Sequence, residues 1–298
     1  MKRYLFFMAS MFLAMGLIVS ACKKDPVKPD SHTDDGGTGK KISKIYCATS
    51  SELGTSRWLS EEWHWTSNGK LERIDHLNND GSVQYSMGFV YEGQVLARVN
   101  YDTDYYALLQ YDNGKLKEVR YYGNGSLGDV YTFTYENGEL KTIVFQSNGV
   151  NSKAEEFPIS VLRFVLPEPS WRFVESMEKR SEGRSAKSSY TTTITLTWSG
   201  GNVSRMDYSE VIEGGYAHEM SEEMQYDTCQ NPYYDCYNGE LNVVRYFSKN
   251  NLRSLVSAFD GQVYHQTFDY TYDGQYPKTQ SITSDGSTYV LTYEFEYL

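Results

Sequence analysis

The sequence predicts an all-β protein in which repeated antiparallel β-hairpins form one long, curved meander sheet. Three observations lead to this fold. Glycines suited to tight turns recur at residues 69, 81, 93, 114, 125, 138 and 149, aromatic residues make up 15% of the chain, and one short motif repeats around these glycines. Turn glycines at this spacing are typical of short strands joined by hairpins.

The first 21 residues have the features of a lipoprotein signal peptide. Lys2 and Arg3 precede a mostly apolar run that ends in small residues immediately before Cys22. The run is shorter than the roughly 20 apolar residues that a membrane-spanning helix needs. We therefore expect cleavage before Cys22 and acylation of its thiol, so that the acyl chains hold the protein on a membrane. A plain signal peptide with an incidental cysteine is the alternative.

Residues 22–40 are predicted to be a flexible tether that follows the lipidated cysteine. They are rich in Pro, Asp and Gly and contain almost nothing apolar, so they cannot bury enough surface to fold. Removal of Lys2 and Arg3 with the signal peptide takes the net charge from −11 to −13. This acidic balance, without a basic patch, argues against a nucleic-acid partner.

Six copies of one motif carry the prediction of hairpins. Each copy has two aromatic or leucine positions separated by one residue, a turn that ends in glycine, and an aliphatic residue soon after it. Glycine and asparagine supply the positive φ that tight hairpin turns demand. The copies are WHWTSNGKLERI (63–74), FVYEGQVLARV (89–99), LQYDNGKLKEV (109–119), FTYENGELKTIVF (133–145), LTWSGGNVSRM (196–206) and the degenerate YTYDGQYP (270–277).

The copies fall into two parts of the chain. Residues 41–150 form an N-terminal hairpin half and residues 190–298 a C-terminal half, either as one continuous sheet or as two related halves. Residues 151–189 interrupt the motif with three prolines and a polar tail, and they are predicted to be an irregular connecting segment.

The loop length within a copy determines which residues face each other. If Asp-Asn-Gly forms a three-residue loop with a bulge, Tyr111 and Leu109 share a face with Val119 and Tyr121. A two-residue loop would instead place Tyr111 opposite Leu116. We prefer the three-residue loop because it groups the apolar side chains, and a slip of one residue would expose them.

Three cysteines remain once Cys22 is acylated, so at most one disulfide forms within an exported chain. Cys229 and Cys236, in CQNPYYDC, are the expected pair, which leaves Cys47 as a free thiol. No metal site is expected, because no second cysteine pair or spaced histidine pair accompanies them.

The sequence lacks the usual signatures of enzymes. No Ser-x-x-Lys, Gly-x-Ser-x-Gly, His-Glu-x-x-His or phosphate-binding glycine motif occurs, so no catalytic residue and no cofactor is predicted. Carboxylates are plentiful, and a glycan-active hydrolase with two of them remains an alternative. However, the adjacent pairs Glu61-Glu62 and Glu222-Glu223 would point to opposite faces of a strand.

The tryptophans offer a candidate binding surface. Trp63 and Trp65 share one face of a predicted strand, and Trp58 is nearby. Such a row could stack on sugar rings, while the alternative is cross-strand aromatic packing that stabilises the sheet.

Several of these segments carry a family resemblance. The copy YDNGKL is similar to the YD repeats of Rhs-type proteins. A closer likeness, through the lipobox, the hairpin copies, YDTCQNPYY (226–234), SKNNL (248–252), YTYDGQYPK (270–278) and the end LTYEFEYL, is to Bacteroidetes lipoproteins of unknown function. This resemblance implies a β fold and an outer-membrane lipoprotein on its periplasmic or outer face. It brings no catalytic residue.

Together these features predict a membrane-anchored, non-enzymatic envelope lipoprotein that binds a glycan or an envelope protein through a β-sheet surface. The alternatives are the two-carboxylate hydrolase and a purely structural envelope spacer.

Overall fold

The computed structural model describes residues 40–51, 54–101, 103–147, 190–212, 216–234, 243–259, 261–287 and 290–298. All of them belong to the compact unit of residues 34–298. The predicted signal peptide, lipidation site Cys22, most of the tether and the connecting segment 151–189 lie outside these ranges.

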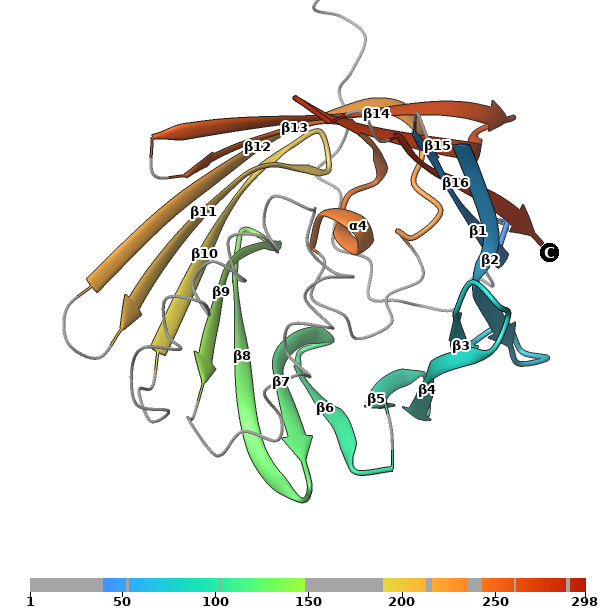
Figure 1. Ribbon diagram of the computed structural model, residues 1–298. Coiled ribbons are helices and arrows are strands. Elements are labelled where there is room, and N and C mark those ends of the chain that lie inside the picture. Colours follow the sequence, from blue (N-terminus) through green and yellow to red (C-terminus); the bar gives the residue numbers. More distant parts are fainter. Residues whose placement is uncertain are drawn as a thin grey trace, which may run out of the picture. The chain divides into compact units, whose positions relative to one another are not determined.

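Sixteen described strands form an antiparallel meander in which each strand pairs with the next one along the chain (Figure 1). The prediction of an all-β meander is confirmed. The strands are β1 (Ile42–Ser51), β2 (Gly54–Trp65), β3 (Leu71–Leu77), β4 (Val83–Glu92), β5 (Val95–Asn100), β6 (Tyr105–Asp112), β7 (Lys115–Gly123), β8 (Ser126–Glu136), β9 (Glu139–Ser147), β10 (Tyr190–Ser199), β11 (Asn202–Ile212), β12 (Tyr216–Gln230), β13 (Asn250–Phe259), β14 (Gln262–Asp273), β15 (Tyr276–Ser284) and β16 (Val290–Tyr297).

The predicted open, curved sheet is wrong in one respect, because the meander closes into a barrel. The first strand, β1, pairs with the last, β16, from Ile42 opposite Tyr297 to Ser50 opposite Val290. The hairpins before and after residues 151–189 therefore belong to one continuous sheet, since β9 also pairs with β10. Closure pairs the edges that an open sheet would leave free.

The motif copies are hairpins, but the Asp-Asn-Gly loop is shorter than predicted. Asn113 and Gly114 have φ values of 51° and 76°, so they form a two-residue turn with both central residues in the left-handed region. Tyr111 accordingly lies opposite Leu116. One extra residue, Lys117, then bulges out and restores the pairing of Leu109 with Val119. The apolar grouping was right, and the three-residue loop was wrong.

All six copies share this register, although the turn of the first copy, Ser67–Gly69, has three residues. In each copy the aromatic residue before the turn faces the second residue after the turn, and a register shift comes directly after this pair. The pairs are Trp65 with Leu71, Tyr91 with Leu96, Tyr111 with Leu116, Tyr135 with Leu140, Trp198 with Val203, and Tyr272 with Pro277. The motif thus encodes a tight turn and a bulge, which bends the strands as a barrel requires.

Lysines link the turn of one hairpin to the turn of a neighbouring one. Lys70 donates a hydrogen bond to the carbonyl oxygen of Gly93 at 2.6 Å and lies over the ring of Tyr91. Lys115 does the same to Gly138 and Tyr135. These lysines therefore join the turns in pairs at one end of the barrel.

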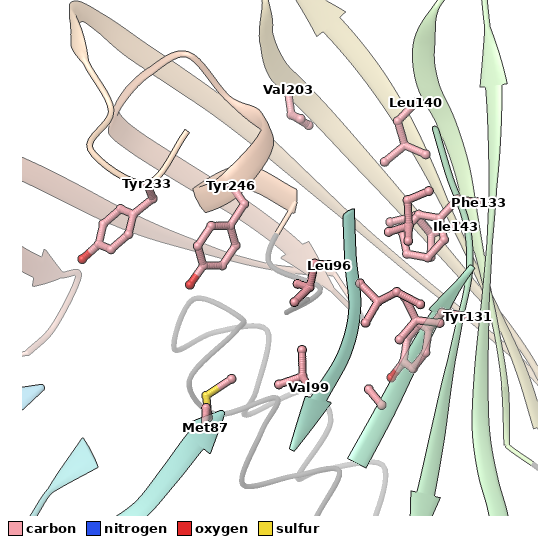
Figure 2. Packing of buried hydrophobic residues seen from close by; sticks show 14 of the residues in the cluster. Met87, Leu96, Val99, Tyr131, Phe133, Leu140, Ile143, Val203, Tyr233 and Tyr246 are labelled. Atoms are coloured by element: carbon pink, nitrogen blue, oxygen red, sulfur yellow. The ribbon is translucent and has the colours of Figure 1, made fainter. Parts of the chain in front are cut away.

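The apolar side chains face the inside of the barrel, where a short helix, α4 (Val243–Phe247), also lies (Figure 1). Figure 2 shows Tyr233 and Tyr246, from the connection between β12 and β13, among residues of the barrel wall such as Met87 and Val99. Within the described ranges, no helix has the length and apolar character needed to cross a membrane.

The outward faces of the strands carry many polar and charged side chains, with exposed valines such as Val90, Val211 and Val263 among them. Thr132 and Thr142 lie on β8 and β9, and Thr195 lies on β10. Charged side chains occupy the outward positions of many other strands, at Glu62, Arg73, Asp75, Arg98, Glu118, Arg120, Arg205, Asp207, Glu223, Arg253, Asp269 and Glu294. Several form ion pairs on this surface, including Arg57 with Glu294 at 2.8 Å and Arg205 with Glu223 at 2.6 Å.

Candidate functional site

The tryptophans of β2 point into the barrel. Trp63 is only 4% exposed, and its ring centroid lies 6.2 Å from that of Trp65 and 6.0 Å from that of Tyr233. Tyr233 also contacts Phe295 on β16. The Trp63 indole N–H donates to the Glu61 carboxylate at 2.8 Å. Trp63 is therefore part of the core, and its ring faces are not available as a platform for sugar stacking.

The other two aromatic candidates are less deeply buried. The Trp65 indole N–H donates to the carbonyl oxygen of Ile42 at 2.7 Å, and Lys41 lies over its ring. Trp58 lies opposite Cys47 on the inward face and is half-buried. The row predicted from the sequence exists, but it lines the inside of the barrel.

A second inward-facing cluster is polar, and the sequence argument missed it. We call it the inner polar stripe. It comprises Glu210, Tyr208, Glu222, Ser257, Gln266 and Ser284, which lie on the inward faces of the adjacent strands β11 to β15. The available signal was the alternation of side chains along two strands. In RMDYSE (205–210) it places Glu210 on the same face as Tyr208, and in EMSEEMQ (219–225) it places Glu222 on the same face as Met220 and Met224.

Glu222 is at the centre of the inner polar stripe. Its side chain is 0% exposed, the Tyr208 hydroxyl donates to Oε2 at 2.9 Å, and the Ser257 hydroxyl donates to Oε1 at 3.1 Å. Burial, followed by the charge of Glu222 and this hydrogen bond, raises the pKa of Tyr208 well above its ordinary value. The phenol therefore stays protonated and remains a hydrogen-bond donor to the carboxylate.

Two side chains in the inner polar stripe each have an acceptor atom without a hydrogen bond to any described residue. They are Oε2 of Glu210 and Oε1 of Gln266, and the two residues are 4% and 3% exposed. Gln266 uses its amide nitrogen to donate to Ser284 at 3.1 Å. Burial raises the pKa of Glu210, and no charged partner contributes to that shift. Buried acceptors of this kind are uncommon, because each costs free energy when left without a donor.

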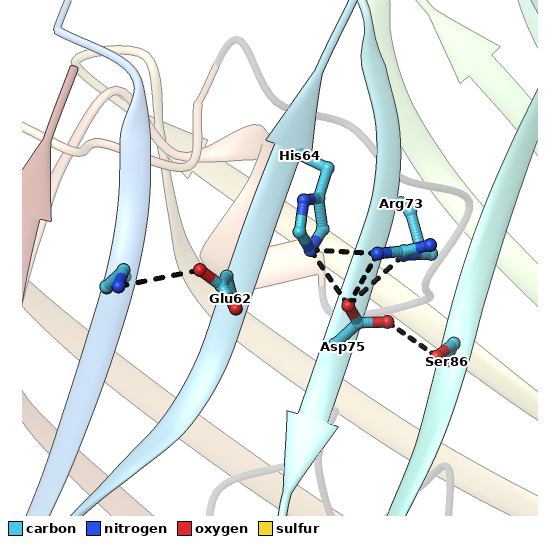
Figure 3. Close-up of polar contacts among 6 residues, drawn as sticks. Glu62, His64, Arg73, Asp75 and Ser86 are labelled. Carbon is cyan, nitrogen blue, oxygen red and sulfur yellow. Dashed lines mark hydrogen bonds and ion pairs between the residues drawn. The ribbon is translucent and has the colours of Figure 1, made fainter. Parts of the chain in front are cut away.

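A polar cluster on the outward face of β2, β3 and β4 brings a serine, a histidine and an aspartate together (Figure 3). His64 Nε2 lies 2.8 Å from Asp75 Oδ2, and the Ser86 hydroxyl donates to Asp75 Oδ1 at 2.5 Å. Arg73 also contacts Asp75. In a hydrolytic triad the serine is bonded to the histidine, which acts as its base. Here the Ser86 hydroxyl is hydrogen-bonded to Asp75, so the cluster lacks the serine–histidine hydrogen bond that a hydrolytic triad needs.

Asp75 is the acceptor at the centre of the outward cluster and is 7% exposed. Burial pushes the pKa of its carboxyl upward. Hydrogen bonds from Ser86 and His64 and the charge of Arg73 outweigh this effect, so the pKa lies below its ordinary value. The cluster is an ion-pair network that holds neighbouring strands together.

The two described cysteines form no disulfide with each other. Cys47 is buried, and this burial, with a smaller contribution from the charge of Glu61, raises its pKa to about 12. Cys229 is half-buried. Cys236 lies outside the described residues, so the predicted disulfide between Cys229 and Cys236 stays a prediction, as does the lipidation of Cys22.

Groups of three or more histidine, cysteine, aspartate or glutamate side chains that could hold a metal ion do not occur among the described residues. Of the adjacent carboxylate pairs, Glu61 and Glu222 face inward, while Glu62 and Glu223 face outward, as the alternation of a strand requires.

Comparisons with known proteins add information on the fold. No protein-family model and no curated protein matches the chain. A porin-like protein from Bacteroides vulgatus ATCC 8482 is similar in structure, with a TM-score of 0.50, 10% sequence identity, and coverage of 87% of this chain and 99% of that one. A porin-like protein from Bacteroides uniformis ATCC 8492 has a TM-score of 0.49, 11% identity, and coverage of 86% and 96%. The likeness to the Bacteroides vulgatus protein supports the barrel fold of this chain.

Proposed function

We propose that this protein is a lipid-anchored, non-enzymatic envelope protein whose barrel stands in an aqueous compartment and binds a partner there, without spanning the lipid bilayer. The observation that carries this proposal is the polarity of the two barrel faces. In membrane-spanning barrels the outward face is an apolar band and the interior is polar. In this chain the buried apolar cluster faces inward, and charged residues occupy outward positions on many strands.

The outward arginines would be costly to place in a lipid bilayer. An arginine on the lipid face costs about 2–4 kcal/mol at the middle of a bilayer. Arg73, Arg98, Arg120 and Arg205 all lie on the outward face within strands. Carboxylates accompany Arg73, Arg120 and Arg205. At the middle of a bilayer the four arginines together would cost about 8–16 kcal/mol, which is comparable with the whole stability of an ordinary folded protein. Attachment through acyl chains on Cys22 would place the same barrel beside the membrane without this cost.

A binding role, to a glycan or to an envelope protein, is consistent with the absence of recognisable catalytic arrangements among the described side chains. The serine of the outward cluster is not activated by its histidine, and Glu222 accepts hydrogen bonds from Tyr208 and Ser257. The resemblance to Bacteroidetes lipoproteins supports an outer-membrane address.

Partitioning between water and the detergent Triton X-114 tests the anchoring part of the proposal. The natural protein is expected in the detergent phase because of its acyl chains. A variant in which a secretory leader without a lipobox precedes Lys23 is expected in the aqueous phase as a folded protein. A barrel that spans lipid would enter the detergent phase in both forms, and that result would refute the proposal.

A further inference from the structure

We propose that the inner polar stripe is a binding site for a small cationic amine. This inference rests on the binding role proposed above and names the class of ligand, but it does not depend on the lipid anchor. It begins from Glu210, a carboxylate that is 4% exposed on the inward face of the barrel. Its Oε2 atom has no hydrogen-bond partner among the described residues.

A buried carboxylate is normally stabilised by a cation, by hydrogen-bond donors or by both, because removal from water strongly disfavours its charge. Burial raises the Glu210 pKa, and among the described side chains no charged group compensates the carboxylate. A ligand that brings a positive charge and N–H donors would supply both missing interactions. An ammonium group carries three donors and no acceptor, and it matches this need.

From Glu210 the inner polar stripe continues across the neighbouring strands, from β11 to β14. Tyr208 lies two positions away on the same face of β11 and bonds to Glu222 on β12. Ser257 on β13 bonds to the other oxygen of Glu222, and Gln266 on β14 is its diagonal neighbour. The unpartnered Oε1 of Gln266 is a further acceptor along this line. The inner polar stripe thus presents acceptors over four adjacent strands.

The chemistry of the inner polar stripe favours an amine over other classes of ligand. Its two unpartnered atoms are both acceptors, and one of them belongs to a carboxylate. An anionic ligand would be repelled by Glu210 and Glu222. A divalent metal ion is less suited, since no cluster of three metal-ligating side chains occurs among the described residues. A linear diamine or triamine can place donors at more than one point along the inner polar stripe.

Thermal unfolding of the mature, lipidated protein in detergent, followed by tryptophan fluorescence, tests this inference. The probes are putrescine and spermidine, with 1,4-butanediol as a neutral analogue of putrescine, a neutral oligosaccharide and Ca²⁺. A ligand that binds the folded state raises the unfolding midpoint in a saturable manner. We expect this result with the amines and not with the other probes.

Two variants locate the site, each compared with its own ligand-free midpoint. Glu210→Gln removes the charge with little change in shape, and we expect it to weaken amine binding roughly 10- to 100-fold, as the loss of a charge-assisted hydrogen bond would. Glu219→Gln, on the outward face of β12, changes the net charge equally and should bind like the wild type. If Glu210→Gln does not fold, Glu210→Asp serves as the second variant; it keeps the charge but withdraws the carboxylate by one methylene, and it should also weaken binding.

The inference is overturned if no amine produces a saturable shift, if Glu210→Gln and Glu219→Gln bind equally well, or if only the oligosaccharide or Ca²⁺ stabilises the protein. These outcomes are independent of the Triton X-114 result, so the anchor and the site can fail separately.

Discussion

Lys70 lies over the ring of Tyr91, with Nζ 4.9 Å from the ring centroid, and the same Nζ donates to the carbonyl oxygen of Gly93 at 2.6 Å. Lys70 follows the turn between β2 and β3, whereas Tyr91 and Gly93 belong to the turn between β4 and β5. One side chain thus joins two hairpins that are not consecutive in the meander.

Replacement of Lys70 by Met should lower the free energy of unfolding by about 0.5–1 kcal/mol, the size of an exposed cation–π contact. The control is Lys117→Met, because Lys117 is an exposed bulge residue. Urea unfolding of both variants measures the difference. Equal stability of the two variants would show that the contact contributes nothing.

Replacement of Gly114 by Ala should destabilise the protein by about 1–2 kcal/mol, since an alanine at φ +76° is strained. A Cβ atom at Gly114 would meet nothing within 4 Å, so backbone strain is the only expected cost. Gly88→Ala is the matched control, because Gly88 has similar free space without a positive φ. A Gly88 variant as unstable as the Gly114 variant in urea would contradict this explanation.

Replacement of Trp63 by Ala should cost about 3–5 kcal/mol, as for other large buried aromatic residues. Trp58→Ala should cost less, because Trp58 is only half-buried. Equilibrium unfolding in urea measures both values. If Trp63→Ala left stability unchanged, its placement in the core would be wrong.

Asp75 should stabilise the protein at neutral pH and lose this effect in acid. Its pKa in the folded state lies below the ordinary value of 3.8, so the stabilisation is present above that value and disappears as the pH falls through the folded-state pKa. Asp75→Asn should therefore cost about 1–3 kcal/mol at pH 7, and progressively less as the pH falls below 3.8. The exposed Asp269→Asn is the control. A cost for Asp75→Asn that did not change with pH would exclude the carboxylate charge as its source.

The contribution of Glu210 to stability should depend on pH in the opposite sense to that of Asp75. Its folded-state pKa lies above the ordinary value of 4.5, so the folded state is most favoured below that value and loses stability as the pH rises through the folded-state pKa. Glu210→Gln should abolish this loss and be more stable than the wild type at pH 8 without ligand. Urea unfolding at pH 4, 6 and 8 measures the effect, and parallel pH profiles for both proteins would argue against it.

The hairpins could be predicted because their signals are local. The turn glycine and the aromatic residue before it, as at Gly114 and Tyr111, lie within a few residues of each other in every copy. The bulge at Lys117 had no such signal, because a bulge and a longer loop produce the same apolar grouping. Closure was also hidden, since the pairing of β1 with β16 joins opposite ends of the chain.

The candidate site was less predictable for a related reason. Alternation along β2 correctly places Trp63 and Trp65 on one face, but it cannot show that Tyr233, from a distant connection, covers Trp63. Likewise, Glu222 looks like one of many solvated glutamates until its hydrogen bonds to Tyr208 and Ser257 are known.

The pairing of β1 with β16 also has a consequence for the order of folding. Synthesis produces β1 before β16, so the edge of β1 that does not pair with β2 waits until Tyr297 has arrived. Contacts between residues so far apart in sequence form slowly. Until they form, the exposed edge can pair with other chains. The final step of biogenesis is therefore a closure reaction, and truncation of β16 should produce aggregates more readily than a shortened barrel.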